Sequence, residues 1–103
     1  MVNRRVVVTG MAGITSLGSE WGSVRDAIFA SRSGVSRMEQ WADIAGLETR
    51  LAAPVPDFEQ PAHYPRKMVR SMGRLSLLAT RATELALADA ELLGDPLLGD
   101  GTT

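Results

Sequence analysis

The longest periodic run of apolar residues in this chain lies over residues 65–93. Apolar side chains recur there in steps of three and four, which is the spacing of one face of an α-helix. The residues of this face are Met68, Met72, Leu75, Ala79, Ala82, Ala86, Ala90 and Leu93. Leu78, Leu85 and Leu92 widen it, so the pattern predicts a single long helix that is covered on more than one side. Pro65 suits the first helical position, because the amide hydrogen that proline lacks has no partner there.

Two shorter patterns precede this helix. Residues 5–10, RVVVTG, form a continuous apolar run rich in β-branched side chains, which is typical of a strand buried on both faces. Ser19 can cap a helix over residues 19–31, and the Ser-Gly pair that includes Gly34 is expected to end it. Trp21 lies on the apolar face of this helix, and we expect it in the core rather than in a ligand site.

The middle of the chain, residues 35–63, has no long period. Three apolar residues between Trp41 and Leu47 predict a short helical turn. Residues 51–55 predict a short strand, which Pro54 confines to the edge of a sheet because proline has no amide hydrogen to donate.

These elements are too few to enclose a core. They amount to one clear strand, one short strand and two helices, and residues 94–103, GDPLLGDGTT, have the composition of turns. A lone strand of the buried type has no neighbour for its edge hydrogen bonds, and a chain of 103 residues is already marginal by its surface-to-volume ratio. We therefore expect an incomplete α/β fold, which is a segment of a larger protein or is completed by another chain.

Composition excludes several kinds of site. The formal net charge is −1, so it implies no general attraction to nucleic acid or to a membrane. The chain has no cysteine, and its single histidine, His63, cannot make a multi-histidine metal site. We expect His63 to be exposed, with no carboxylate placed to orient it. The N-terminal apolar run is too short for a signal peptide or a spanning helix, so we expect a soluble, cytoplasmic protein without a metal.

The glycine-punctuated segment 10–18, GMAGITSLG, raises a nucleotide-binding alternative. A dinucleotide fingerprint has glycines at its first, third and sixth positions, and these hold Gly10, Ala12 and Thr15 here. The glycine spacing of short-chain reductases fails in the same way. We therefore favour a structural turn with close backbone approach, and a fragment of a nucleotide-binding oxidoreductase stays as the lesser alternative.

Basic side chains gather at the start of the predicted long helix. Arg66, Lys67, Arg70 and Arg74 fall within an arc of about 100° at the helical repeat. Cations are disfavoured at a helix N-terminus, so this stripe runs against the helix dipole. Two interpretations remain open: a solvated face with some local ion pairing, or a docking site for an acidic partner.

Three blocks of sequence resemble one family. RRVVVTGMAGITSLGSEW resembles the opening of the β-ketoacyl-[acyl-carrier-protein] synthases I and II, with its buried strand, Thr-Gly pair and glycine-terminated loop. SRSGV, at residues 31–35, resembles the turn after the family's first helix, and RKMVRSM with LATRATELALADAEL resembles its next long helix. The blocks follow the family's order and spacing over essentially the whole chain. Ala12 and Ser31 stand where glycines are usual, and Arg74 adds a charge that the family does not fix.

This resemblance implies a thiolase-like, layered α–β–α fold, of which residues 1–103 are the N-terminal portion of the N-terminal domain. It also implies a decarboxylating Claisen condensation between an acyl thioester and malonyl-acyl carrier protein in fatty-acid elongation, performed by a homodimer without a cofactor. The family's cysteine, two histidines and lysine lie beyond residue 103, so no catalytic residue is assigned here and the chain alone is expected to be inactive.

The same resemblance gives the basic stripe a partner. In the family, an Arg-Lys pair and the arginine three residues after it dock the acidic second helix of acyl carrier protein. The matching positions are Arg66, Lys67 and Arg70. A carrier-binding module without catalysis remains an alternative to a domain of a complete synthase.

Overall fold

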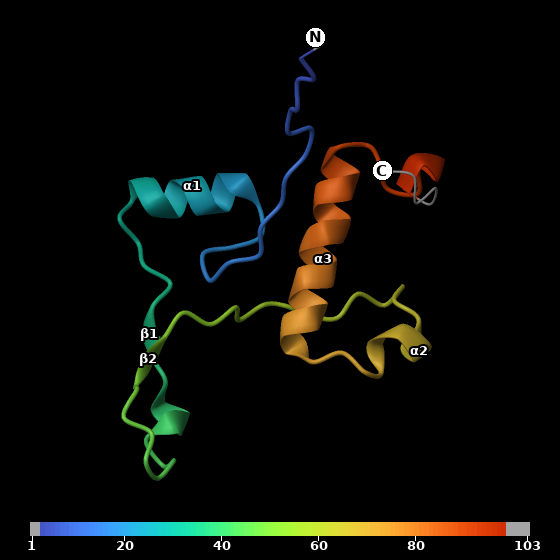
Figure 1. The fold of residues 1–103 in the computed structure, drawn as a ribbon. Coiled ribbons are helices and arrows are strands. Elements are labelled where there is room, and N and C mark those ends of the chain that lie inside the picture. Colours follow the sequence, from blue (N-terminus) through green and yellow to red (C-terminus); the bar gives the residue numbers. More distant parts are fainter. Residues whose placement is uncertain (1–2, 99–103) are drawn as a thin grey trace. The chain divides into compact units, whose positions relative to one another are not determined.

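The computed structural model describes residues 3–98. In chain order its elements are α1 (Trp21–Phe29), β1 (Ser36–Arg37), the 3₁₀ turn η1 (Glu39–Trp41), β2 (Leu51–Ala52), α2 (Arg66–Val69), α3 (Arg74–Asp89) and the 3₁₀ turn η2 (Pro96–Leu98) (Figure 1). They belong to two compact units, one made of Met1–Gly13 with Gln60–Thr103 and the other of Ile14–Glu59. Of the turn expected over residues 94–103, the described part holds η2, and residues 99–103 lie outside the description.

The single helix expected over residues 65–93 is wrong, because this segment forms two helices, α2 and α3 (Figure 1). Gly73 separates them with an extended backbone (φ −79°, ψ 177°) and caps the start of α3. Glycine is about 1 kcal/mol less favourable than alanine inside a helix, which favours a break at this position. At the other end, Glu91 has a φ of 59°, and this left-handed conformation ends the helical path just after α3.

The N-terminal valines do not form the expected buried strand within this chain. Val6, Val7 and Val8 are 95%, 68% and 77% exposed, and no strand is found at these residues. A strand needs a neighbouring backbone for its hydrogen bonds, and residues 3–98 supply none to this segment. The exposed valines therefore fit the expectation that the fold is incomplete.

The end of this apolar run lies against the last turn of α3, within the same unit. A Cβ atom added at Gly10 would lie 2.6 Å from the carbonyl oxygen of Ala86 and 2.6 Å from the amide nitrogen of Ala90. No side chain fits in that space. The close backbone approach expected at this glycine is therefore confirmed.

The second unit contains α1 and a small sheet. α1 begins after Glu20 rather than Ser19, with no side-chain cap, and the turn after it has Ser31 in the left-handed region at φ 56°. Strands β1 and β2 pair antiparallel, with Ser36 opposite Ala52, which confirms a short strand in the predicted segment 51–55. The turn predicted between Trp41 and Leu47 is confirmed by η1 and the turns that follow it.

The core of the described chain is very small. Only Ala27 and Tyr64, at 2% and 7% exposure, are buried among residues 3–98. Trp21 is 69% exposed, so its expected place in the core is wrong for this chain. The apolar face of α1 has too little of its own unit to pack against, which is the condition expected of an incomplete domain.

Candidate functional site

Three of the basic residues singled out from the sequence lie together on α2. Arg66 and Lys67 are the first two residues of this helix, and Arg70 is its C-cap, with its amide bonded to the carbonyl of Arg66. Arg66 and Arg70 are one helical turn apart and so share a face of the helix. All three side chains are exposed, and no ion pair with them is found within residues 3–98.

The fourth member of the expected stripe, Arg74, does not belong to α2. It opens α3, beyond the break at Gly73, so the stripe on one continuous helix is wrong. The break also changes how the helix dipole acts on these charges. Arg66 and Lys67 lie in a helix of four residues, which has almost no dipole to oppose them, and only Arg74 stands at the N-terminus of a longer helix.

His63, shortly before α2, forms a cluster of polar side chains with Arg81 and Glu84 of α3. The Oε1 atom of Glu84, on α3, is 2.6 Å from Nη1 of Arg81 and 2.9 Å from Nε2 of His63. His63 is exposed, as expected, but the expectation that no carboxylate orients it is wrong. The two residues are 21 positions apart, so no local spacing revealed the contact. The Arg81–Glu84 pair does have a sequence signal, because residues three apart in a helix are neighbours.

Tyr64 is the buried member of this cluster. Its ring contacts that of His63 edge to face, with ring centres 4.9 Å apart. Its hydroxyl group is buried and makes no hydrogen bond of standard geometry, although its interaction with Glu84 is the largest influence that lowers the pKa of that carboxyl. Burial, followed by Glu84, raises the pKa of Tyr64. Glu84 is therefore an anion at neutral pH and Tyr64 a neutral phenol.

An open hollow of about 540 Å³ lies beside this cluster, between α3 and the segment that leads into α2. Its walls include His63, Tyr64, Met68, Thr80, Glu84 and Leu87. Most of this lining is apolar, and its polar side chains are those of the Glu84 cluster and two threonines of α3, Thr80 and Thr83.

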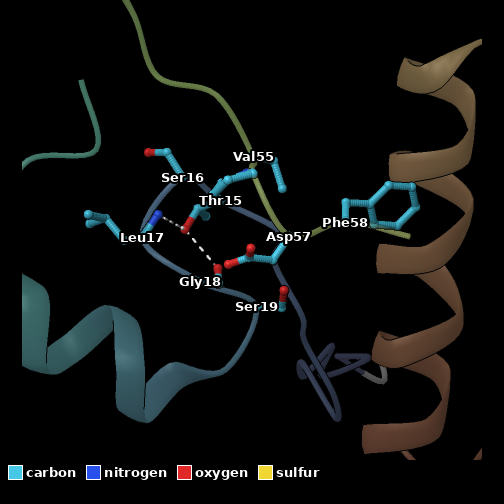
Figure 2. A pocket seen from close by; sticks show the side chains of 9 residues that line it. Thr15, Ser16, Leu17, Gly18, Ser19, Val55, Asp57 and Phe58 are labelled. Carbon is cyan, nitrogen blue, oxygen red and sulfur yellow. Dashed lines mark hydrogen bonds between the residues drawn. The ribbon is translucent and has the colours of Figure 1, made fainter. Parts of the chain in front are cut away.

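A second hollow, of about 230 Å³, lies in the other unit and is formed by residues 15–19, at the end of the glycine-punctuated segment, and residues 55–58 (Figure 2). Thr15 closes the loop on itself: its Oγ1 donates to the carbonyl of Gly18 and accepts from the amide of Leu17 (Figure 2). The amides of Thr15 and Gly18 also bond within the loop. These amides cannot cradle a phosphate, and the one charged residue in the lining, Asp57, would repel it. The loop is therefore a structural turn.

Other classes of site are not formed by the described residues. Within residues 3–98, no three side chains of histidine, aspartate or glutamate gather so that they could hold a metal ion. No helix in that range has the length and apolar character needed to cross a bilayer.

Comparison with known proteins places this geometry in a family. The family described as "Beta-ketoacyl synthase, N-terminal domain" matches residues 3–103. The chloroplastic 3-oxoacyl-[acyl-carrier-protein] synthase II of Arabidopsis thaliana is 34% identical over 86 residues, which are 84% of this chain and 16% of that protein. The tetracenomycin polyketide synthase ketoacyl synthase beta subunit of Streptomyces glaucescens is 32% identical over 87 residues, 84% of this chain and 21% of that protein.

A solved structure gives the same result. The crystal structure of a β-ketoacyl synthase from Burkholderia phymatum is similar with a TM-score of 0.89 and 55% identity, over 96% of this chain and 24% of that one. The chain belongs to the β-ketoacyl synthase family and matches its N-terminal domain. It spans less than a quarter of the length of these relatives, and its helices and short strands are part of a thiolase-like fold.

Proposed function

We propose that residues 1–103 are the first portion of the N-terminal domain of a β-ketoacyl-[acyl-carrier-protein] synthase that elongates fatty acids. In the complete enzyme a cysteine thiolate holds the growing acyl group. Malonyl on acyl carrier protein loses carbon dioxide, and the resulting carbanion attacks the acyl thioester. A carbon–carbon bond forms and the thiolate leaves. The match to the synthase family over residues 3–103 is the observation that carries this proposal.

The chemistry itself belongs to residues outside this chain. The chain has no cysteine, and the one histidine it contains, His63, is bonded to Glu84. We therefore propose that the chain alone is inactive and that its contribution is structural and recognitive. From the family we also expect a cytoplasmic homodimer without a cofactor.

The recognition we propose is docking of acyl carrier protein on Arg66, Lys67 and Arg70. What supports it is the contrast between these exposed cations, which have no anionic partner within residues 3–98, and Arg81, which is paired with Glu84. An acidic helix laid across α2 would supply the missing anions. Exposed ion pairs contribute only about 0–1 kcal/mol each, so this surface would mainly steer and orient the carrier.

Charge reversal in the complete synthase tests this proposal. The variant Arg66→Glu/Lys67→Glu/Arg70→Glu is expected to raise KM for malonyl-acyl carrier protein and to leave kcat nearly unchanged. Turnover of a carrier-free thioester, such as malonyl-coenzyme A, should stay as it is. Arg32→Glu, at an exposed arginine of the other unit, is the control for a charge reversal outside the proposed docking surface. An unchanged KM for the carrier in the triple variant would refute the docking assignment.

Two alternatives to fatty-acid elongation are separated by activity. The similarity to a polyketide synthase subunit favours a polyketide pathway as the second candidate. Assay of the complete protein with fully reduced acyl chains and with poly-β-ketoacyl chains on the carrier distinguishes the two. A protein that binds the carrier and condenses neither would be a carrier-binding module without catalysis.

A further inference from the structure

The basic helix α2 is too short to hold its own conformation. It comprises four residues, Arg66–Val69, and isolated helices need roughly 12 residues or more before they are even marginally stable in water. None of its own side chains is buried. The direction in which α2 presents Arg66 and Lys67 is therefore set by the segments on either side of it.

The segment before α2 is fixed to α3 at Glu84. His63 bonds to the Glu84 carboxylate at 2.9 Å, and the adjacent Tyr64 is 7% exposed and in ring contact with His63. Arg81 holds the same carboxylate oxygen at 2.6 Å. Only Pro65 separates this anchor from the first arginine of α2. Proline restricts both its own backbone and that of the residue before it. The direction in which α2 starts is therefore tied to the position of the anchor.

The segment after α2 contacts the same face of α3. The Sδ atom of Met72 lies 4.0 Å from the hydroxyl oxygen of Thr80, and the amide of Met72 bonds to the carbonyl of Val69. Thr80 and Glu84 are one helical turn apart. The helix α2 is thus held at both ends to two neighbouring points on α3. Of the two points, the one at Glu84 has the stronger, charge-assisted bonds.

We propose that Glu84 is a positioning residue for carrier docking, which acts by holding His63 and thereby fixing α2 in the orientation that an acidic helical partner recognises. This inference rests on the proposed docking of acyl carrier protein at Arg66, Lys67 and Arg70. Glu84 does not touch the partner. The lowered pKa of Glu84 keeps its carboxyl group ionised, so the anchor persists at neutral pH.

A positioning role and a purely electrostatic role of Glu84 predict opposite changes in KM for the carrier when Glu84 is substituted. Removal of one negative charge beside a basic surface strengthens its attraction for an acidic partner. If Glu84 acted only through its charge, Glu84→Gln would therefore lower KM for the carrier. If it positions α2, the same change weakens docking.

The experiment measures steady-state kinetics of the complete synthase with malonyl-acyl carrier protein. Glu84→Gln is expected to raise KM by roughly threefold to tenfold, as follows from weakening a hydrogen-bonded ion pair, with kcat and malonyl-coenzyme A turnover unchanged. His63→Ala should raise KM in the same way, and His63→Gln, whose amide can still donate to Glu84, should restore part of it. Glu91→Gln is the matched control, because it removes an exposed carboxylate that has no ion pair within residues 3–98.

Hydrogen exchange separates a shift of α2 from a general loss of structure. Amides of residues 66–72 should exchange faster in Glu84→Gln, while those of α3 keep their protection. A KM that falls or stays unchanged in both Glu84→Gln and His63→Ala would overturn the inference. If those variants are neutral while the triple charge reversal raises KM, the positioning role fails and docking stands. If the triple reversal is also neutral, docking itself fails.

Discussion

The amide nitrogen of Met11 donates a hydrogen bond to Oδ2 of Asp89 at 3.0 Å, and this contact joins two parts of the chain that are 78 residues apart. Asp89 is the last residue of α3, where the helix dipole disfavours a negative charge. The Met11 amide offsets this penalty by supplying a donor. Together with the close approach of Gly10 to Ala86 and Ala90, it fixes the N-terminal segment to the end of α3.

The space around Gly10 predicts a loss of stability on addition of a single methyl group. A Cβ there would lie 2.6 Å from backbone atoms of Ala86 and Ala90, which cannot rotate away. We expect Gly10→Ala to lower the free energy of unfolding of the complete protein by about 1–3 kcal/mol, the usual effect of overpacking. Thermal melts check this, with Gly13→Ala as the control, because a Cβ at Gly13 meets nothing within 4 Å. Equal melting temperatures for the two variants would contradict the prediction.

The bond between Met11 and Asp89 predicts a difference between two substitutions at position 89. Asp89→Ala removes the acceptor and should destabilise the protein by about 1 kcal/mol. Asp89→Asn keeps an acceptor oxygen and removes the unfavourable charge at the helix end, so we expect little or no loss. Chemical denaturation at neutral pH measures both. Equal losses in the two variants, which both lack the charge, would show that the charge rather than the acceptor oxygen matters at this position.

The lowered pKa of Glu84 predicts a pH-dependent contribution to stability. A carboxyl group with a pKa below its ordinary value of 4.5 stabilises the folded state above that pH, and the contribution disappears as pH falls through the folded-state pKa. Glu84→Gln should therefore be less stable than the unaltered protein at pH 7, and the difference should shrink below pH 4.5. Denaturant titrations at several pH values test this. A difference that is constant with pH would exclude the ionised carboxylate as its source.

For the buried hydroxyl of Tyr64 we expect the opposite effect of substitution on stability. It has no hydrogen bond of standard geometry, so Tyr64→Phe should be neutral or slightly stabilising at pH 7. Because the pKa of Tyr64 is raised above 10.0, the neutral phenol is favoured, and the unaltered protein should lose stability as pH rises beyond that value. The phenylalanine variant lacks this alkaline loss. Unfolding curves between pH 8 and 11 would show the two proteins separating, and clear destabilisation of Tyr64→Phe at pH 7 would argue for a real bond to Glu84.

Local pattern was enough to predict α1, the helical character of residues 65–93 and the short strand β2. It did not show where the last helical segment breaks, and the strand expected at residues 5–10 is not formed within this chain. In the sequence, apolar residues keep a helical spacing on both sides of Gly73. In the structure, Met72 lies between the two helices and still contacts Thr80 of α3. The spacing alone therefore predicts one helix. The glycine was the one local signal of the break.

The exposure of Trp21 and the bond from His63 to Glu84 were not predicted from the sequence, each for its own reason. The apolar face that carries Trp21 was predicted correctly as apolar, and its exposure reflects how little of this chain is available to cover it. His63 and Glu84 are brought together by the path of the chain between them, which no spacing rule encodes. The basic residues Arg66, Lys67 and Arg70 could be found from sequence because charge and family resemblance agreed on them, and their docking role stays a prediction.

The exposed valines at positions 6–8 have a consequence for the expression of this protein. Within residues 3–98 no strand pairs with them, so wherever they are left uncovered they offer a template for pairing with another backbone. Two copies of this segment could supply each other's missing backbone hydrogen bonds by pairing edge to edge. Pairing between two such chains would compete with correct folding, so the yield of soluble protein should improve when expression is slow and the concentration of unfolded chains stays low.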